Sequence, residues 1–237
     1  MGGEKADLLF RLWELVLLQR SLLVLADSPD RSAAAVFALM SLIFPLRQEG
    51  PFWPYLTVFD AQFPALQAPG GGWPGGVAGA TNPLFAKLSA KFTACLDLRA
   101  EHAQRLRAKH GAAPAAKHYL THAPHSALRP PLQLSKLLGR GENAEERHIN
   151  AQIVRKKLLA LTLSFLEPLH LFLARDCNDL KVFELRAFLD FVGGTALPVD
   201  AFYPCKADLQ RVYTDFARTG AFRAHMKAHF NVHARRG

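Results

Sequence analysis

The chain has 237 residues, of which half are hydrophobic and 21% are charged, so it holds enough apolar material for one large domain or two small ones. This composition excludes a disordered or fibrous protein. The formal net charge is +9, and the basic excess is uneven: residues 101–140 hold seven basic residues against one acidic residue, and residues 201–237 hold seven against two. Such an excess attracts phosphate groups, whether of nucleic acid or of an anionic membrane.

Neither a membrane span nor a secretory signal is expected. The longest apolar stretches, residues 15–26 and 32–45, are shorter than the roughly 20 residues that a bilayer requires. The N-terminus lacks a basic region followed by a cleavable apolar segment. Cys95, Cys177 and Cys205 are odd in number and far apart, which is typical of reduced thiols in a cytoplasmic protein and not of a disulfide framework or a zinc site.

The first residues of the chain carry a helix signal, a strand signal and a second helix signal. Apolar residues at helical spacing predict a helix over residues 7–19. The continuous apolar run at residues 22–26 predicts a strand that is buried on both faces. Asp27 or Ser28 is then expected to cap a helix over residues 32–46.

Three further strands are predicted over residues 55–59, 77–80 and 92–98. A glycine-rich loop over residues 68–76 precedes the second of them, and a short helix begins at Thr81-Asn82-Pro83. Strands that alternate with helices in this way favour a mostly parallel sheet with helices on its faces.

The second half of the chain is predicted to be helical. A long helix over residues 145–174 is apolar almost all round and should be central and buried, with a kink or an end at Glu167-Pro168. A helix over residues 180–192 should stop at Gly193-Gly194. Another is expected over residues 206–218, and Phe222, Met226 and Phe230 mark the last one.

The predicted fold class is therefore an α/β central domain, with a mostly parallel sheet flanked by helices, followed by an all-α C-terminal lobe. We place the central module at residues 8–100, a basic linker or crossover at 101–143, and the helical lobe at 144–237.

Candidate motifs for chemistry are incomplete. Gly70, Gly72 and Gly75 match GxGxxG, but prolines interrupt the motif and no helix signal follows directly, so a surface loop is the better interpretation. The segment Gly75–Thr81 lacks the lysine of a P-loop. No nucleophile elbow or Cys/His pair is visible. We predict no catalytic residue and no cofactor.

Histidines recur at helical spacing near the C-terminus, at His225, His229 and His233. Two such side chains can hold a metal ion, but a third ligand and a nearby glutamate are missing, so solvated or capping histidines are favoured. His118, His122 and His125 are interpreted in the same way. The basic and aromatic residues of 201–237 form no nucleic-acid motif, and no specific nucleic-acid partner is expected.

Several segments together resemble the DENN-domain family, most closely its DENN domain-containing protein 6 type. The segments are LWELVL (12–17) with LLVLADSP (22–29), ALMSLIFPL (38–46) with FWPYLTVFD (52–60), GATNPLF (79–85), LLALTLSFLEPL (158–169), and YTDF (213–216) ahead of Phe222. The resemblance covers about residues 8–98 and 148–230. It implies a central module and a downstream lobe, and an upstream longin-type module that this chain does not contain.

The resemblance also implies a function. Members of the family act as guanine-nucleotide exchange factors for Rab small GTPases on endosomal or Golgi-derived membranes. We thus expect a peripheral regulator of membrane traffic without bond-breaking chemistry of its own, with an anionic membrane surface as a further partner. A non-catalytic scaffold of the same fold, or a basic protein that binds RNA or phosphate, are the alternatives.

Partners of open α/β sheets favour the carboxyl ends of the strands. The residues that follow three predicted strands are therefore the candidate partner-binding residues: Asp27, Ser28, Asp60, Thr81, Asn82, Pro83 and Phe85. A helix cap is an equally good interpretation of Asp27, and a turn is one of Asn82-Pro83.

Overall fold

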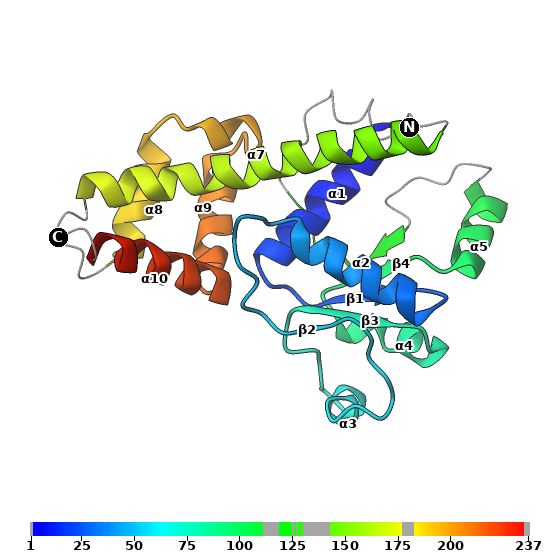
Figure 1. Ribbon diagram of the computed structural model, residues 1–237. Coiled ribbons are helices and arrows are strands. Elements are labelled where there is room, and N and C mark those ends of the chain that lie inside the picture. Colours follow the sequence, from blue (N-terminus) through cyan, green and yellow to red (C-terminus); the bar gives the residue numbers. More distant parts are fainter. Residues whose placement is uncertain are drawn as a thin grey trace.

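The computed structural model describes residues 2–110, 119–124, 126, 128–129, 143–176 and 183–234. A five-stranded mixed sheet flanked by helices is followed along the chain by a helical lobe (Figure 1). The predicted fold class is confirmed. The positions of the two domain boundaries stay a prediction.

The sheet and its surrounding helices form in this order: α1 (Gly2–Leu17), β1 (Leu22–Leu25), α2 (Pro29–Ser41), β2 (Phe52–Trp53), α3 (Phe63–Gln67), β3 (Val77–Ala80), α4 (Pro83–Lys87), a 3₁₀ turn (Ser89–Lys91), β4 (Ala94–Asp97), α5 (Ala100–His110) and β5 (Leu120–Thr121). The lobe contains α7 (Ala144–Asp176), α8 (Leu185–Gly194), a 3₁₀ turn (Pro198–Ala201), α9 (Lys206–Phe216) and α10 (Gly220–Ala234).

Strand β1 lies at the centre of the sheet, whose order is β2-β3-β1-β4-β5. It runs parallel to β3 and β4, and β2 runs parallel to β3, whereas β5 is antiparallel to β4. All four residues of β1 are buried, as expected for a continuous apolar strand that is covered on both faces. The sheet is therefore mostly parallel, with one antiparallel edge strand.

Alternating residues of β1 divide the core into two layers. Leu22 and Val24 belong to the cluster that contains residues of α1, α2 and the helical lobe. Leu23 and Leu25 belong to a smaller cluster with residues of α3 and α4. On the first face α2 lies close to the sheet, because a Cβ on Gly79 of β3 would stand 2.2 Å from the Ser32 hydroxyl oxygen. The sheet thus has helices on both faces.

The predicted strands at 22–26, 77–80 and 92–98 are confirmed as β1, β3 and β4. The strand predicted at residues 55–59 is wrong, because β2 is the earlier pair Phe52–Trp53. Residues 55–59 form bends and turns, in which the Asp60 carboxylate accepts hydrogen bonds from the Thr57 backbone N–H at 2.6 Å and its hydroxyl at 2.8 Å. This closed turn leaves the aromatic residues of the segment outside the sheet.

The region predicted as a linker contains regular structure. Helix α5 is polar, so its sequence carries no apolar stripe to signal a helix, and β5 has only two residues. Leu120 of β5 is nonetheless buried and pairs with Leu96 of β4. The expectation of an irregular segment is wrong for these residues.

Helix α7 connects the lobe with the sheet. It has 33 residues and continues through Pro168. Of the two alternatives predicted for Glu167-Pro168, a kink or an end, the end is therefore wrong, and the kink stays a prediction. Its buried Thr162 accepts a hydrogen bond from the indole N–H of Trp13 in α1 at 3.0 Å. Phe165 packs edge-on against Trp13. Helix α1, the first element of the chain, is therefore anchored in the lobe.

One helix among the described residues is long and apolar enough to span a membrane, residues His148–Arg175 of α7. From the sequence, only the apolar stretches at residues 15–26 and 32–45 were considered as possible membrane spans, and this helix contains neither of them. Half of its most apolar window is buried inside the protein, and the core helix of a globular protein has the same length and composition. This is weak evidence for a membrane span.

Candidate partner-binding face

Three parallel strands end at the same edge of the sheet, and the residues that follow them lie there together. Asp27, Ser28 and Arg31 follow β1, Thr81 and Asn82 follow β3, and Tyr55 follows β2. We call these six residues the carboxyl-edge face. Four of the seven predicted site residues belong to it, whereas Arg31 and Tyr55 were not predicted.

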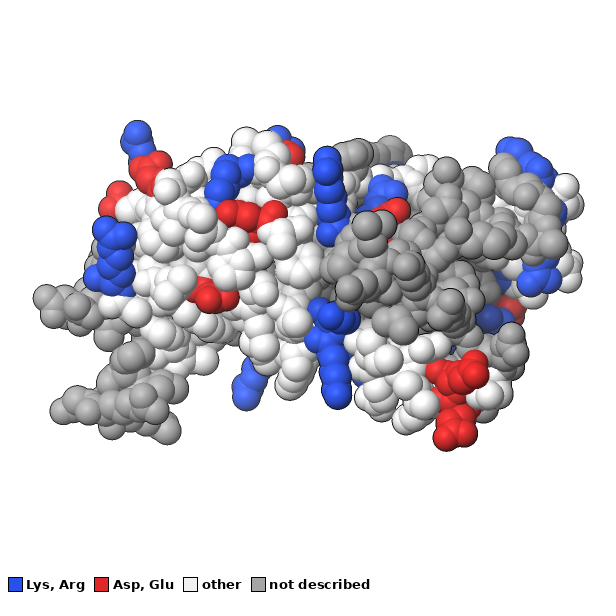
Figure 2. All heavy atoms as spheres, turned by 90° about the horizontal axis from the view of Figure 1, so that it is seen from above, with Lys and Arg blue, Asp and Glu red and all other residues white. Residues whose placement is uncertain are grey.

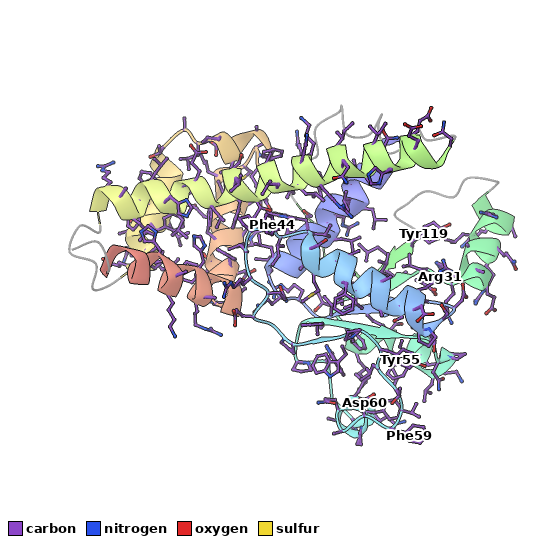
Figure 3. All side chains as sticks on the ribbon, in the orientation of Figure 1. Arg31, Phe44, Tyr55, Phe59, Asp60 and Tyr119 are labelled. Carbon is purple, nitrogen blue, oxygen red and sulfur yellow. The ribbon has the colours of Figure 1, made fainter. Side chains whose placement is uncertain are left out.

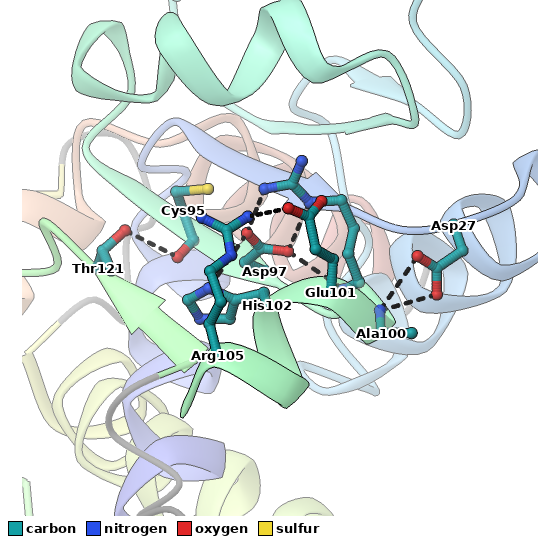
Figure 4. Close-up of polar contacts among 9 residues, drawn as sticks. Asp27, Cys95, Asp97, Ala100, Glu101, His102, Arg105 and Thr121 are labelled. Atoms are coloured by element: carbon teal, nitrogen blue, oxygen red, sulfur yellow. Dashed lines mark hydrogen bonds and ion pairs between the residues drawn. The ribbon is translucent and has the colours of Figure 1, made fainter. Parts of the chain in front are cut away.

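Asp27 joins two helices at this edge. Its carboxylate accepts a hydrogen bond from Arg31 Nη1 at 2.6 Å. It also accepts from the backbone N–H of Ala100, at the start of α5, at 3.0 and 3.1 Å (Figure 4). A carboxylate at a helix start satisfies a free N–H group and interacts favourably with the helix dipole. The cap of α2 is Ser28, whose hydroxyl accepts from the Arg31 N–H. Asp27 or Ser28 was predicted to cap α2. The residue that does so is Ser28, whereas Asp27 caps α5.

Asp97, the last residue of β4, forms a largely buried ion pair at the same end of the sheet (Figure 4). Arg99 Nε and Nη2 donate to its two carboxylate oxygens at 2.9 and 2.6 Å, and His102 Nδ1 lies 3.6 Å away. Burial favours the neutral acid, but the hydrogen bonds from Arg99 outweigh it and hold the pKa of Asp97 below its usual value. This pair fixes the loop between β4 and α5.

The residues after β3 have different surroundings. The Thr81 hydroxyl lies 3.1 Å from the Tyr55 hydroxyl. Asn82 caps α4, accepting from the Leu84 N–H at 2.9 Å, and Pro83 is the first residue of that helix. Phe85 is fully buried and packs edge-on against Phe63. Phe85 therefore holds α4 in place and offers no surface to a partner in this structure.

Asp60, the remaining predicted site residue, lies in the loop before α3, apart from Arg31 and close to Phe59 (Figure 3). Its carboxylate closes the turn with Thr57 described above. The side chain beside it, Phe59, is 94% exposed. The loop consequently presents an aromatic ring to solvent at the same side of the molecule as the carboxyl-edge face.

Large aromatic side chains are exposed along α2, β2 and the following loop. Phe37 and Phe52 pack edge-on with ring centroids 6.0 Å apart, and Tyr55 is 41% exposed. We call Phe37, Phe52, Tyr55 and Phe59 the aromatic strip. Aromatic and arginine side chains are enriched in protein–protein interfaces. In the sequence Tyr55 and Phe59 indicated a strand, because the same residue types form both strands and interfaces.

The histidines form a pair between two helices. His170 of α7 and His225 of α10 have their Nε2 atoms 2.9 Å apart, and the ring of His229 stacks on His170. Burial and the neighbouring imidazoles lower the pKa of His225 to about 4. Within the described part of the chain, no group of three or more His, Cys, Asp or Glu side chains is arranged to hold a metal ion. His118 and His125, and the side chain of His233, lie outside the described residues.

The cysteines differ in their surroundings. Cys95 in β4 is buried, and burial together with Asp97 raises the pKa of its thiol to about 12. Cys205 is exposed and free. Cys177 lies outside the described residues. A thiol that stays protonated is a poor nucleophile, so Cys95 acts as a core residue.

Comparison with known proteins identifies partial relatives. No protein-family model matches the chain. It is 32% identical to Protein DENND6B of Homo sapiens over 180 residues, which is 69% of this chain and 29% of that protein. It is 46% identical to Protein DENND6A of Gallus gallus over 80 residues, which is 32% of this chain and 13% of that protein. It is 47% identical to the Protein DENND6 homolog of Dictyostelium discoideum over 55 residues, which is 23% of this chain and 8% of that protein.

The chain thus spans less than a third of the length of these relatives. The similarity to the human protein nevertheless extends over most of this chain, and all three relatives are named as DENND6 proteins. The resemblance predicted from the sequence motifs is confirmed: this chain is homologous to a part of the DENND6 proteins, of the DENN-domain family.

Proposed function

We propose that this chain is part of a guanine-nucleotide exchange factor for a Rab small GTPase, and that the GTPase contacts the carboxyl-edge face and the aromatic strip. The proposal rests on the homology to DENND6 proteins. It is supported by the exposed side chains of the aromatic strip, because aromatic groups lose little conformational entropy on binding and bury a large area.

An exchange factor breaks no covalent bond. It binds the switch segments of the GTPase in a conformation that disturbs the contacts to magnesium and phosphate, so that the nucleotide dissociates and GTP binds from solution. On this chain, Phe59 and Tyr55 would enter apolar hollows of the GTPase. Arg31 would reach a carboxylate of the partner, since its present partner Asp27 is itself 37% exposed. A longin-type module from elsewhere in the protein would add contacts.

The first test is capture of Rab proteins that are loaded with GDP, loaded with GTP or stripped of nucleotide. We expect selective capture of one stripped Rab. Phe59→Ala and Tyr55→Ala should each weaken capture by about tenfold or more, as for central aromatic residues of an interface. Leu171→Ala, which shortens an apolar side chain on α7 about as exposed as Tyr55, is the matched control and should leave capture unchanged.

Other outcomes identify the alternatives. Capture of a Rab without preference for the stripped form, and without acceleration of nucleotide release, indicates a scaffold of the same fold. Binding that ignores nucleotide state and collapses steeply with salt indicates a basic phosphate- or RNA-binding protein. Unchanged capture by both aromatic variants refutes the proposed interface. We propose a cytoplasmic location, peripheral on endosomal or Golgi-derived membranes.

A further inference from the structure

A second surface lies away from the carboxyl-edge face, between helix α7 on one side and the end of α2 with the segment after it on the other (Figure 3). It is a pocket of about 420 Å³. Its apolar lining comes from Met40, Leu42, Phe44 and Leu46 on one side and from Leu158 and Leu159 on the other. Phe44 at its mouth is 63% exposed. Leu163, one helical turn beyond Leu159, is 47% exposed and extends the apolar surface along α7.

Cations surround this pocket. Arg155 and Lys156 line it, and none of the described residues that line it is acidic. A neighbouring hollow of about 640 Å³, between the segment after α2 and α10, is lined by Arg47, Arg223 and Lys227, with one acidic residue, Glu49. We call Phe44 and the five basic residues of the two hollows the basic-apolar face.

The charges of this face are available to a partner. Arg47, Arg155, Lys156 and Lys227 form no ion pair within the described residues. On the face of the molecule seen from above, Lys and Arg side chains lie at several separate places, some of them beside Asp or Glu (Figure 2). The five basic residues of the basic-apolar face come from three segments: α7, the segment after α2, and α10. A single acidic side chain of a partner protein would engage one or two of them, whereas a plane of many phosphate groups can engage all of them.

We propose that the basic-apolar face docks on an anionic phospholipid bilayer, with Phe44 inserted at the level of the headgroups. Aromatic rings favour that level, and the basic side chains reach the lipid phosphates while their apolar stems lie along the protein. The docking needs no GTPase, and its test is therefore independent of the proposed exchange activity.

The test is co-sedimentation of the 237-residue chain with vesicles, in the absence of any GTPase. One set of vesicles consists of phosphatidylcholine alone, and the other contains roughly one third phosphatidylserine. We expect binding to the second set only, and its loss at high salt because ions screen the surface potential. Equal binding to both sets, or binding to neither, overturns the proposal and leaves a protein as the occupant of the pocket.

Three variants locate the surface. Arg155→Gln/Lys156→Gln should lower the partition coefficient by about 25-fold, since each basic residue near an anionic surface contributes about fivefold. Phe44→Ser should lower it by about tenfold through loss of the inserted ring. The control Arg107→Gln/Lys109→Gln removes the same charge from exposed positions on α5 and should change binding less than threefold.

The control also separates docking from attraction by net charge. An equal loss in the two double variants overturns the proposal, because binding would then depend on overall charge and not on this face. Unchanged binding of Phe44→Ser overturns the insertion of the ring. The double variants change only exposed side chains, and their circular dichroism should match that of the unmodified chain.

Discussion

Replacement of Thr162 by valine tests whether α1 and the helical lobe unfold together. The Thr162 hydroxyl accepts from Trp13 Nε1 at 3.0 Å and donates to the Leu158 carbonyl at 3.0 Å, and both Thr162 and Trp13 are fully buried. Valine fills the same space but leaves the indole N–H unpaired. A buried donor without a partner costs about 1–3 kcal/mol. For a chain of this size, about 2 kcal/mol corresponds to a fall in the unfolding temperature of about 4–8 °C.

The measurement is urea unfolding followed by far-ultraviolet circular dichroism and by tryptophan fluorescence. The two signals should give one coincident transition, shifted in Thr162→Val. In a Trp13→Phe background the indole N–H is absent, so the same replacement should cost about 1–2 kcal/mol less. The reasoning is refuted if Thr162→Val loses less than about 0.5 kcal/mol, or if it costs the same in both backgrounds.

Three further perturbations have defined outcomes. Gly79→Ala brings a methyl group against the Ser32 hydroxyl and should cost at least about 2 kcal/mol in urea unfolding. Asp97→Asn removes the bidentate partner of Arg99 and should lower the free energy of unfolding by about 2 kcal/mol at neutral pH. Because the folded-state pKa of Asp97 is lowered, the stability that this carboxylate contributes is present above the normal carboxyl pKa and is lost as the pH falls below it. The stability of the variant should therefore depend less on pH in acid than that of the unmodified chain. His225 has a folded-state pKa of about 4, so the unfolded chain binds its proton first and stability should fall between about pH 6.5 and 4; His225→Gln should flatten that fall, and an unchanged slope would contradict the assignment.

The strands that the sequence predicted correctly are those that have a neighbouring strand on each side and are buried throughout. Residues 22–25 and 94–97 are continuous buried runs, for which burial and composition agree. Residues 55–59 have the composition of a strand, but Pro54 and the turn closed by Asp60 remove them from the sheet. Local composition indicates whether side chains suit a β-strand, but it does not indicate whether a neighbouring strand is there to pair with.

The candidate site was predictable only in part. The positions of Asp27 and Thr81 at the ends of parallel strands follow from the order of elements. The role of Asp27 at the start of α5 does not follow from that order. Asp27 and Ala100 are 73 positions apart, and the contact between them depends on the pairing of β1 with β4. The exposure of Phe59 and Phe44 likewise depends on which surfaces other helices leave uncovered.

The anchoring of α1 has a consequence for biosynthesis. Helix α1 hydrogen-bonds through Trp13 to a residue 149 positions later, and Arg20, which follows the helix, hydrogen-bonds to a residue 195 positions later. Until that later sequence has been made, the apolar side of α1 has no lasting partner, and exposed apolar surface of this kind invites aggregation or chaperone binding. A nascent chain truncated near residue 110 should therefore engage chaperones that the complete chain no longer needs, and ribosome-bound chains of increasing length would show where this dependence ends.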